Sequence, residues 1–210
     1  MSTATIENRR PSEDLVLPAA TLAAFAARVL HALAAVEPDA EAASQLLVEA
    51  DLTGADAHGI FRLPQYATMI RQGAINPTPS ITVHRSAAAT AIVDGGDGLG
   101  HLVMKKAAET AVELAREAGI GWVGARNSNH AGSASIWAAL PVEHGMIGLY
   151  SAVASANHMA IWGGTDPAPG TNPLSIGLPA GDGHLLMTDM AHTGASLGPL
   201  NTYAFTLQPM

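Results

Sequence analysis

The stretch that decides the fold is TAIVDGGDGLGHLVMKKAAETAVELAREAGIGWVGARNSNHAG, residues 90–132. Its apolar spacing changes from the two-residue period of a strand, over residues 90–93, to the 3.6-residue period of a helix over residues 101–118. Residues 95–100 between them predict a glycine-rich loop, and Gly119 is placed to cap the helix. An apolar strand and a polar turn follow. A strand, a helix and a second strand in this order predict an α/β fold.

Helices are predicted before this stretch and mixed elements after it. Helical spacing indicates helices over residues 18–34 and 39–52, and a third helix that begins near His58 and ends before Gly73. A helix is also expected from residue 133 to residue 143, and Pro141 should kink or shorten it. The remaining predicted strands are short and cover residues 81–84, 120–124, 146–152, 174–178 and 185–190.

This order predicts an α/β fold class with an N-terminal helical part and a mixed α/β domain. We expect residues 1–16 to be a flexible N-terminus because they are polar and lack a periodic apolar pattern. Residues 17–78 form the helical part. Residues 79–210 form the α/β domain.

Composition excludes several classes of function. The chain has 210 residues, of which 48% are hydrophobic and 13% charged, and this excludes an intrinsically disordered chain. A net charge of −8 without clustered Lys and Arg predicts no nucleic-acid partner. The absence of cysteine excludes disulfides, thiolate metal sites and a cysteine nucleophile. Arg28 interrupts the most apolar stretch, residues 17–36, so we expect a buried helix, no membrane span and a cytoplasmic protein.

Two short motifs suggest chemistry but do not fit their context. Gly96 and Gly98 could begin a dinucleotide-binding fingerprint, but His101 occupies the position of its third glycine. The G-x-S-x-G pattern at residues 194–198 resembles a nucleophile elbow. No Asp, Glu or His follows Ser196, so the other two members of a hydrolase triad are missing in the required order.

A histidine and an arginine near the predicted third helix form a candidate substrate site. His58 follows Asp56 and Ala57 at the predicted start of this helix, and Arg62 lies four residues further on, which would put both side chains on one face. The N-terminus of a helix favours a neutral imidazole and an anionic ligand. The guanidinium could hold the carboxylate of a 2-oxo acid through paired hydrogen bonds while the histidine protonates the carbonyl oxygen. The same pattern allows two other interpretations. One is a solvent-exposed Arg62 beside a histidine at the helix terminus, and the other is a metal site formed by Asp56 and His58.

Two loops complete the set of candidate segments. His130 lies in the polar turn at residues 127–132, where an exposed position with neighbouring amides resembles a site loop, although by itself the pattern favours a helix-capping turn with an incidental His. Residues 162–173 are rich in Gly and Pro and predict a structured loop. Within this loop, Pro173 should hold Asn172 in an extended conformation.

Four long segments occur in a fixed order, and they read DLTGADAHGIFRLPQYATMIRQGAINP (51–77), ARNSNHAGSASIWAALPVEHGMIGL (125–149), IWGGTDPAPGTNPLSIGLP (161–179) and LLMTDMA (185–191). Together they closely resemble the malate/L-lactate dehydrogenase family, which is unrelated to the Rossmann-type lactate dehydrogenases. The resemblance covers nearly the whole chain from about Leu17. It implies an oxidoreductase that transfers hydride between NAD or NADP and a 2-oxo or 2-hydroxy acid. It further implies a non-Rossmann cofactor site in an α/β fold, and a homodimer.

The resemblance also assigns roles to individual residues, and it implies no metal ligand. His58 matches the proton donor of the family, Arg62 matches the residue that grips the substrate carboxylate, and His130 matches a histidine with an acid/base role in some members. Residues 17–78 would thus be the substrate and catalytic part, and residues 79–210 the cofactor-binding domain. The matched cofactor contacts are Ser155, Thr171, Asn172, Leu185, Leu186, Met187, Thr188, Asp189, Met190 and Ala191.

The chain departs from the family pattern in several places. Ala57 stands where the family usually has Ser, and Val153 and Ala154 replace a usual Thr-Asn pair. Family members are markedly longer, so the resemblance implies that the chain is truncated and lacks a Gly-Lys-Gly cofactor segment and much of the dimer. Two alternatives to the dehydrogenase follow. One is a catalytically silent fragment that acts as an interaction module, and the other is a metal-dependent enzyme that uses Asp56 and His58.

Overall fold

The N-terminal part of the chain is helical. A computed structural model describes residues 16–154, 157 and 159–193. Its first elements are α1 (Ala19–Ala32) and α2 (Glu37–Leu52), which confirm the first two predicted helices. Two single 3₁₀ turns and the short helix α3 follow, and they span Asp56–His58, Ile60–Arg62 and Leu63–Arg71.

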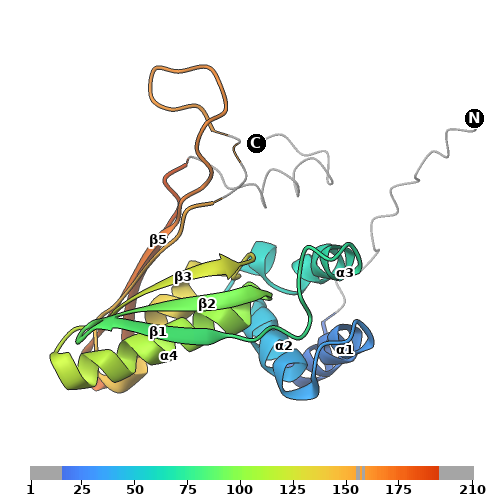
Figure 1. The fold of residues 1–210 in the computed structure, drawn as a ribbon, viewed down its shortest axis with the longest axis horizontal. Coiled ribbons are helices and arrows are strands. Elements are labelled where there is room, and N and C mark those ends of the chain that lie inside the picture. Colours follow the sequence, from blue (N-terminus) through green and yellow to red (C-terminus); the bar gives the residue numbers. More distant parts are fainter. Residues whose placement is uncertain (1–15, 155–156, 158, 194–210) are drawn as a thin grey trace, which may run out of the picture.

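A three-stranded sheet comes next and has the order β1–β2–β3. Strand β1 (Thr82–Ala87) pairs antiparallel with β2 (Thr90–Gly98), and β2 pairs parallel with β3 (Trp122–Ser128). Helix α4 (Gly100–Ala118) connects β2 to β3 and covers one face of the sheet, as Figure 1 shows. The mixed strand directions confirm an α/β fold and differ from the parallel sheet of a Rossmann domain.

The second sheet has the order β4–β5–β6, and both of its strand pairs are antiparallel. Helix α5 packs against this sheet. Pro141 lies where α5 ends and a 3₁₀ turn begins, which confirms the predicted shortening of this helix. The elements are α5 (Ala134–Ala139), the 3₁₀ turn Leu140–His144, β4 (Gly148–Ser151), β5 (Leu174–Pro179), the 3₁₀ turn Gly181–Gly183 and β6 (Leu185–Met190).

Buried apolar clusters join these parts. The largest cluster packs α1, α2 and α3 together and includes Leu30, Leu47 and Tyr66, and it reaches the start of α4 through Leu99 and Leu102. A second cluster connects α2, α4 and α5 around Trp137. A third packs α4 on the first sheet. The helical part and the α/β part therefore share a continuous set of packed elements.

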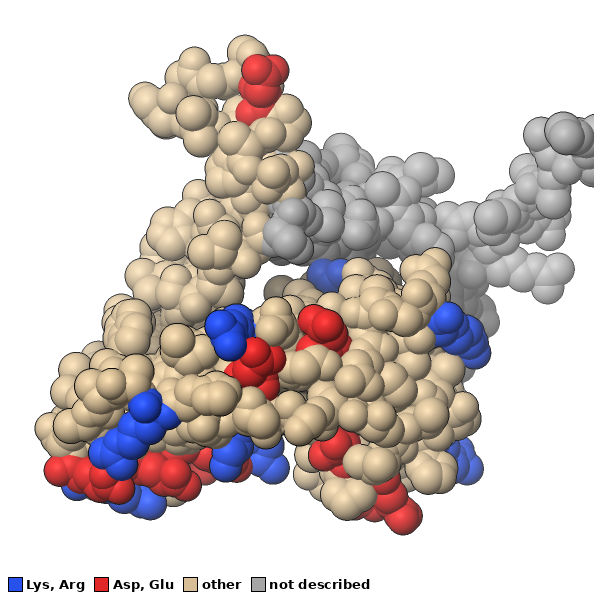
Figure 2. All heavy atoms as spheres, viewed as in Figure 1, with Lys and Arg blue, Asp and Glu red and all other residues tan. Residues whose placement is uncertain are grey.

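Charged side chains are distributed unevenly over the face of the molecule that Figure 2 shows. Figure 2 shows that acidic and basic side chains are mixed along the edge occupied by α4, so neither sign forms a large patch there. The loop that leads from β4 to β5 projects from the body and carries almost no charge on this face. Its tip is closed by an antiparallel bridge between Ala160 and Pro167.

The predicted third helix is wrong in its first half. It is interrupted at Gly59, whose backbone has φ −89° and ψ −143°, outside the helical region. His58 and Arg62 therefore lie on two separate 3₁₀ turns instead of one α-helical face. The physical reason is the Asp51 carboxylate, which accepts the Ile60 N–H at 3.0 Å and occupies the space beside Gly59.

Two further local expectations are wrong. Most of the predicted loop at residues 95–100 belongs to the irregular end of β2, where Gly96 and Asp97 have positive φ. Asn172 is not extended, because its φ is +43°. Asn tolerates this region better than most residues, and here its side-chain Oδ1 accepts the Ala154 N–H at 2.9 Å, which helps to fix the turn.

No helix in the described ranges is both long and apolar enough to span a membrane. The pattern at residues 194–198 lies outside the described residues, as do residues 1–15. The division of the chain near residue 78 into two functional parts stays a prediction.

Gly100→Ala tests the packing that positions the loop after β3. A Cβ at this position would lie 2.1 Å from the Asn129 carbonyl oxygen and 2.5 Å from that of His130, and backbone atoms cannot move aside easily. We expect the free energy of unfolding to fall by about 1–3 kcal/mol, measured by urea denaturation. Gly124→Ala is the matched control, because a Cβ there meets no atom within 4 Å and should leave stability nearly unchanged. Equal losses in both variants would contradict the packing role of Gly100.

Candidate active site

Three segments that are far apart in the sequence bring their aromatic side chains together. His58 lies on the first 3₁₀ turn, Tyr66 on α3, and His130 on the loop after β3. The rings of His58 and His130 are stacked, with centroids 5.6 Å apart and an interplanar angle of 16°. The Tyr66 hydroxyl lies 2.6 Å from Nδ1 of His130. The structure thus brings together the two histidines that the sequence singled out.

Arg62 is held beside this pair by its own turn. Its Nε donates to the Ala57 carbonyl at 2.8 Å, and one terminal nitrogen donates to Oε1 of Gln65 at 2.9 Å. A guanidinium has five N–H groups, and the residues that the structure describes use two of those of Arg62, so three are available to a ligand. The side chain is half-buried, which limits its freedom without closing it off from solvent. Such a preorganised guanidinium is suited to binding a carboxylate.

The loop that carries His130 is anchored on both sides. The Asn129 side-chain amide donates to the carbonyl oxygens of Asp97 at 2.9 Å and Gly98 at 3.1 Å. On the other side, Nε1 of Trp137 donates to the Ala131 carbonyl at 2.9 Å. Together with the close approach of Gly100, these bonds fix the backbone that presents His130.

The electrostatic environment of the site favours neutral imidazoles. Burial and the nearby charge of Arg62 lower the pKa of His58 below its ordinary value of 6.5, while Asp189 and Asp56 partly oppose this. Part of the His130 side chain is exposed, yet the atoms packed around its ring exclude enough water to lower its pKa to about 3, with Arg62 contributing. The sequence predicted a neutral imidazole at His58 from a helix N-terminus. The structural causes are burial and Arg62 instead.

A third histidine lies behind the site. His101, at the start of α4, is fully buried, and Tyr66 meets its ring edge-on with centroids 5.7 Å apart. Neither ring nitrogen of His101 has a hydrogen-bond partner among the described residues. Burial lowers its pKa to about 4.

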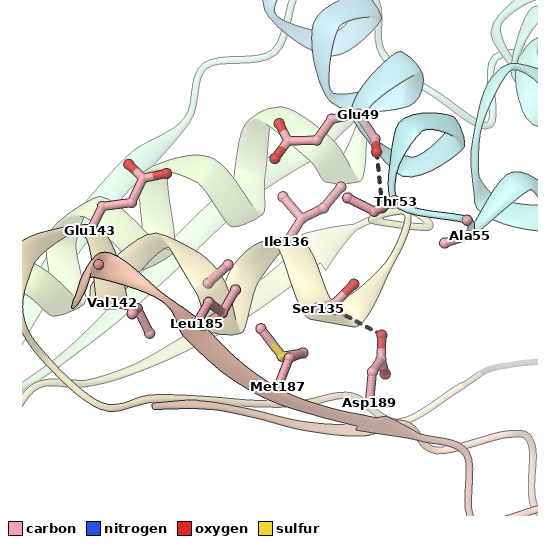
Figure 3. Close-up of a pocket in the computed structure, with 13 residues that line it drawn as sticks. Glu49, Thr53, Ala55, Ser135, Ile136, Val142, Glu143, Leu185, Met187 and Asp189 are labelled. Carbon is pink, nitrogen blue, oxygen red and sulfur yellow. Dashed lines mark hydrogen bonds between the residues drawn. The ribbon is translucent and has the colours of Figure 1, made fainter. Parts of the chain in front are cut away.

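Strand β6 places Asp189 near His58 and beside a hollow of about 620 Å³. Asp189 accepts the Ser135 N–H at 2.9 Å, at the start of α5. Figure 3 shows Leu185, Met187 and Asp189 pointing from β6 into this hollow, with the end of α2 and the start of α5 on its other sides. Side chains alternate across a strand, so Leu186, Thr188 and Met190 project to the opposite face. The predicted cofactor stretch is therefore divided between two faces of the sheet.

Two further predicted cofactor residues, Thr171 and Asn172, lie in the loop from β4 to β5. The Thr171 carbonyl accepts the His192 N–H at 3.0 Å, and the Asn172 carbonyl contacts Nδ1 of His192. Ala191 directly follows β6. Ser155 lies outside the described residues.

Sequence reasoning missed several residues that position the site. Tyr66 lies at an apolar position of the predicted third helix, where a packing role is the ordinary expectation, and no motif marks Asp51 or Asn129. The available signal for Tyr66 was its spacing of four residues from Arg62, which places both on neighbouring turns. In the part of the chain that the structure describes, no group of three or more His, Asp or Glu residues is arranged to hold a metal ion.

Comparison with known proteins identifies the class of this mixed α/β chain. The sequence profile of the malate/L-lactate dehydrogenase family matches residues 17–209. The malate dehydrogenase of Pyrococcus abyssi is 39% identical over 187 residues, which cover 89% of this chain and 51% of that protein. The L-sulfolactate dehydrogenase of Methanocaldococcus jannaschii is 38% identical and is matched over 82% of this chain and 49% of its own length. The chain belongs to the malate/L-lactate dehydrogenase family.

Solved structures agree with this assignment. The malate dehydrogenase of Pyrococcus horikoshii matches with a TM-score of 0.84 and 38% identity over 89% of this chain and 53% of that one. The malate dehydrogenase of Entamoeba histolytica matches with a TM-score of 0.89 and 31% identity over 94% of this chain and 55% of that one. The predicted fold class and family are confirmed. The chain spans about half the length of the curated relatives it matches.

The buried histidines predict how stability changes with pH. The folded-state pKa of His101, about 4, is below the ordinary 6.5, so the unfolded chain binds more protons between these values. Stability from this group is complete above pH 6.5 and is lost as pH falls toward 4. Within that window one group contributes a slope of up to about 1.4 kcal/mol per pH unit. Urea denaturation between pH 7 and pH 4.5 should show a shallower loss in His101→Phe than in the wild type, and parallel curves would contradict this assignment.

Proposed function

We propose that this protein is an NAD(P)-dependent oxidoreductase that interconverts a 2-oxo acid and the corresponding 2-hydroxy acid. The observation that carries the proposal is the stacked pair His58 and His130 beside the half-buried guanidinium of Arg62. This arrangement offers an anion-binding group and proton-handling groups in one place. The names of the relatives support the proposal, because they include malate and L-sulfolactate dehydrogenases.

Arg62 is the proposed anchor for the substrate carboxylate. Its contacts with Ala57 and Gln65 fix the guanidinium and leave three N–H groups for an anion. Two parallel hydrogen bonds from a guanidinium to a carboxylate also set the orientation of the substrate. The adjacent carbonyl or hydroxyl group of a 2-oxo or 2-hydroxy acid would then lie near the histidine pair.

His58 is the proposed proton-transfer group. In oxidation, a neutral imidazole accepts the proton of the substrate hydroxyl, and in reduction the imidazolium returns a proton to the carbonyl oxygen. The lowered pKa of His58 favours the neutral imidazole, which can act as a base. The charges of Asp189 and Asp56 limit how far the pKa falls. A bound nicotinamide cofactor supplies or accepts the hydride.

The hollow beside β6 is the proposed place for part of that cofactor. Its volume of about 620 Å³ and partly apolar lining lie in the range of small-molecule sites, and Asp189 connects it to the surroundings of His58. Leu185 and Met187 would contact the cofactor there. Ser155, Thr171, Asn172, the remaining residues of β6 and Ala191 are further proposed cofactor contacts on the strength of the family pattern. The same pattern supports a homodimer, and composition supports a cytoplasmic location.

The two alternative functions, a metal-dependent enzyme and a silent interaction module, receive different support from the structure. A metal-dependent enzyme would need a third ligand beside Asp56 and His58, and the described residues provide no such group. Asp56 instead accepts the N–H of Ala57 at 3.0 Å. A catalytically silent interaction module would keep the fold but would not turn over substrate. We prefer the dehydrogenase because the histidine pair and the guanidinium meet in one place.

His58→Ala tests the proposed proton transfer. The variant should lower the rate of 2-oxo acid reduction by about 100-fold or more, because positioned acid/base groups contribute at least this factor. The measurement is NADH and NADPH oxidation against a panel of 2-oxo acids, with circular dichroism to confirm that each protein is folded. Unchanged turnover would remove His58 from the chemistry. A folded but inactive wild-type chain would favour the silent module, whereas activity abolished by a chelator would favour the metal enzyme.

Arg62→Lys tests carboxylate binding separately. A lysine ammonium is a point charge and cannot reproduce the paired hydrogen bonds of a guanidinium. We expect KM for the 2-oxo acid to rise by about tenfold, the value of one such hydrogen bond, while KM for the cofactor changes little. Equal KM values for the 2-oxo acid in both proteins would place the carboxylate elsewhere.

A further inference from the structure

His130 receives two contacts at the same ring nitrogen. Its Nδ1 lies 2.6 Å from the Tyr66 hydroxyl oxygen and 3.4 Å from the backbone nitrogen of Gly132. These two contacts come from different elements, because Tyr66 belongs to α3 and Gly132 to the loop before α5. The other ring nitrogen, Nε2, is on the far side of the imidazole from both.

The Gly132 contact, a weak hydrogen bond at 3.4 Å, favours one of the two possible positions of the His130 proton. A backbone N–H can only donate, so it requires a lone pair on Nδ1 of His130. A hydroxyl can donate or accept, and in front of that lone pair the Tyr66 hydroxyl must donate. A neutral imidazole with a free Nδ1 carries its single proton on Nε2.

The burial of Tyr66 stabilises its hydrogen bond with His130. Its side chain is 1% exposed and packed in the helical core, so the ring cannot swing away and water does not compete at the hydroxyl. His101 lies against the Tyr66 ring edge-on and is itself enclosed. A buried hydroxyl without a hydrogen-bond partner would destabilise the folded protein, and this favours the bond to His130 further.

We propose that Tyr66 is a positioning residue that fixes His130 in the Nε2–H tautomer, so that His130 serves the reaction as a neutral hydrogen-bond donor. This inference rests on the proposed function, because it assigns His130 a task at the same site. His130 then donates a hydrogen bond from Nε2 to the substrate oxygen and keeps its proton throughout. His58 alone exchanges a proton with that oxygen.

The electrostatics of the site agree with this division of tasks. Burial, Arg62, His58 and His101 all act to lower the pKa of His130 to about 3, so the ring does not gain a second proton near neutral pH. Asp189 and Asp56 favour the protonated form of His58, whereas in the described ranges of the chain no carboxylate has this effect on His130. Two stacked imidazoles in one site are thereby separated into a proton carrier and a fixed donor.

The direct test is the tautomer of His130 in the full 210-residue chain. Two-bond ¹H–¹⁵N correlation spectra of histidine-labelled protein distinguish a protonated ring nitrogen from one with a free lone pair, and His130→Gln assigns the signals. We expect Nε2 of His130 to be protonated and Nδ1 to be free in the wild type. In Tyr66→Phe, which removes only the hydroxyl, the two nitrogens should shift toward a mixture of tautomers. The same variant should show a fall in kcat/KM of about tenfold, the value of one hydrogen bond.

Tyr150→Phe is the matched control, because it also removes the hydroxyl of a largely enclosed tyrosine, one packed in the cluster around Trp137. It should leave the His130 tautomer as in the wild type. A wild-type spectrum with the proton on Nδ1, or identical His130 shifts in wild type and Tyr66→Phe, would overturn the inference. The wild-type spectrum decides the tautomer even if Tyr66→Phe fails to fold. An inactive wild-type chain with the expected tautomer would overturn the proposed function and support the role of Tyr66 in positioning His130.

Discussion

The hydrogen bond from the Ile60 N–H to the Asp51 carboxylate is the constraint on which the site depends. It holds the chain at Gly59, where an added Cβ would overlap the same carboxylate, and so prevents one continuous helix from Asp56 to Arg71. With the helix interrupted, His58 stacks on His130, and Arg62 bonds back to the Ala57 carbonyl. Burial raises the pKa of Asp51, and the bond to Ile60 counteracts this effect.

Sequence periodicity was sufficient for most helices and strands, but it could not locate this interruption. The apolar positions Leu63, Tyr66 and Ile70 have helical spacing, and this pattern extends back to His58 because an isolated glycine such as Gly59 is tolerated inside a helix. The break depends on the carboxylate of Asp51, eight residues before Gly59, and the spacing of apolar residues cannot predict such a contact. For the same reason, Asn172 was predicted to be extended from Pro173 alone, whereas its conformation also depends on Ala154.

The candidate site shows a similar division. His58, Arg62 and His130 could be chosen from the sequence because their residue types suit the chemistry and their segments resemble a known family. For Tyr66 the only local signal is its spacing from Arg62, which does not reveal a role for the hydroxyl, because a tyrosine in an apolar stripe usually contributes packing and its partner His130 is 64 residues away along the chain. The family pattern matches Leu185 to Ala191 to cofactor contacts, but it does not say which face of the strand each side chain takes, and in β6 neighbouring side chains project to opposite faces.

The alternation of side chains also affects the register in which β6 pairs with β5. Leu185 and Met187 on the inner face and Leu186 and Met190 on the outer face are all apolar, so burial alone distinguishes weakly between the native pairing and one shifted by a single residue. Polar contacts must select the register instead. Asp189 reaches the N–H of Ser135, and the buried Ser175 hydroxyl donates to the Thr188 carbonyl at 3.0 Å. The carboxylate at the edge of the proposed active site thus also helps to align β6.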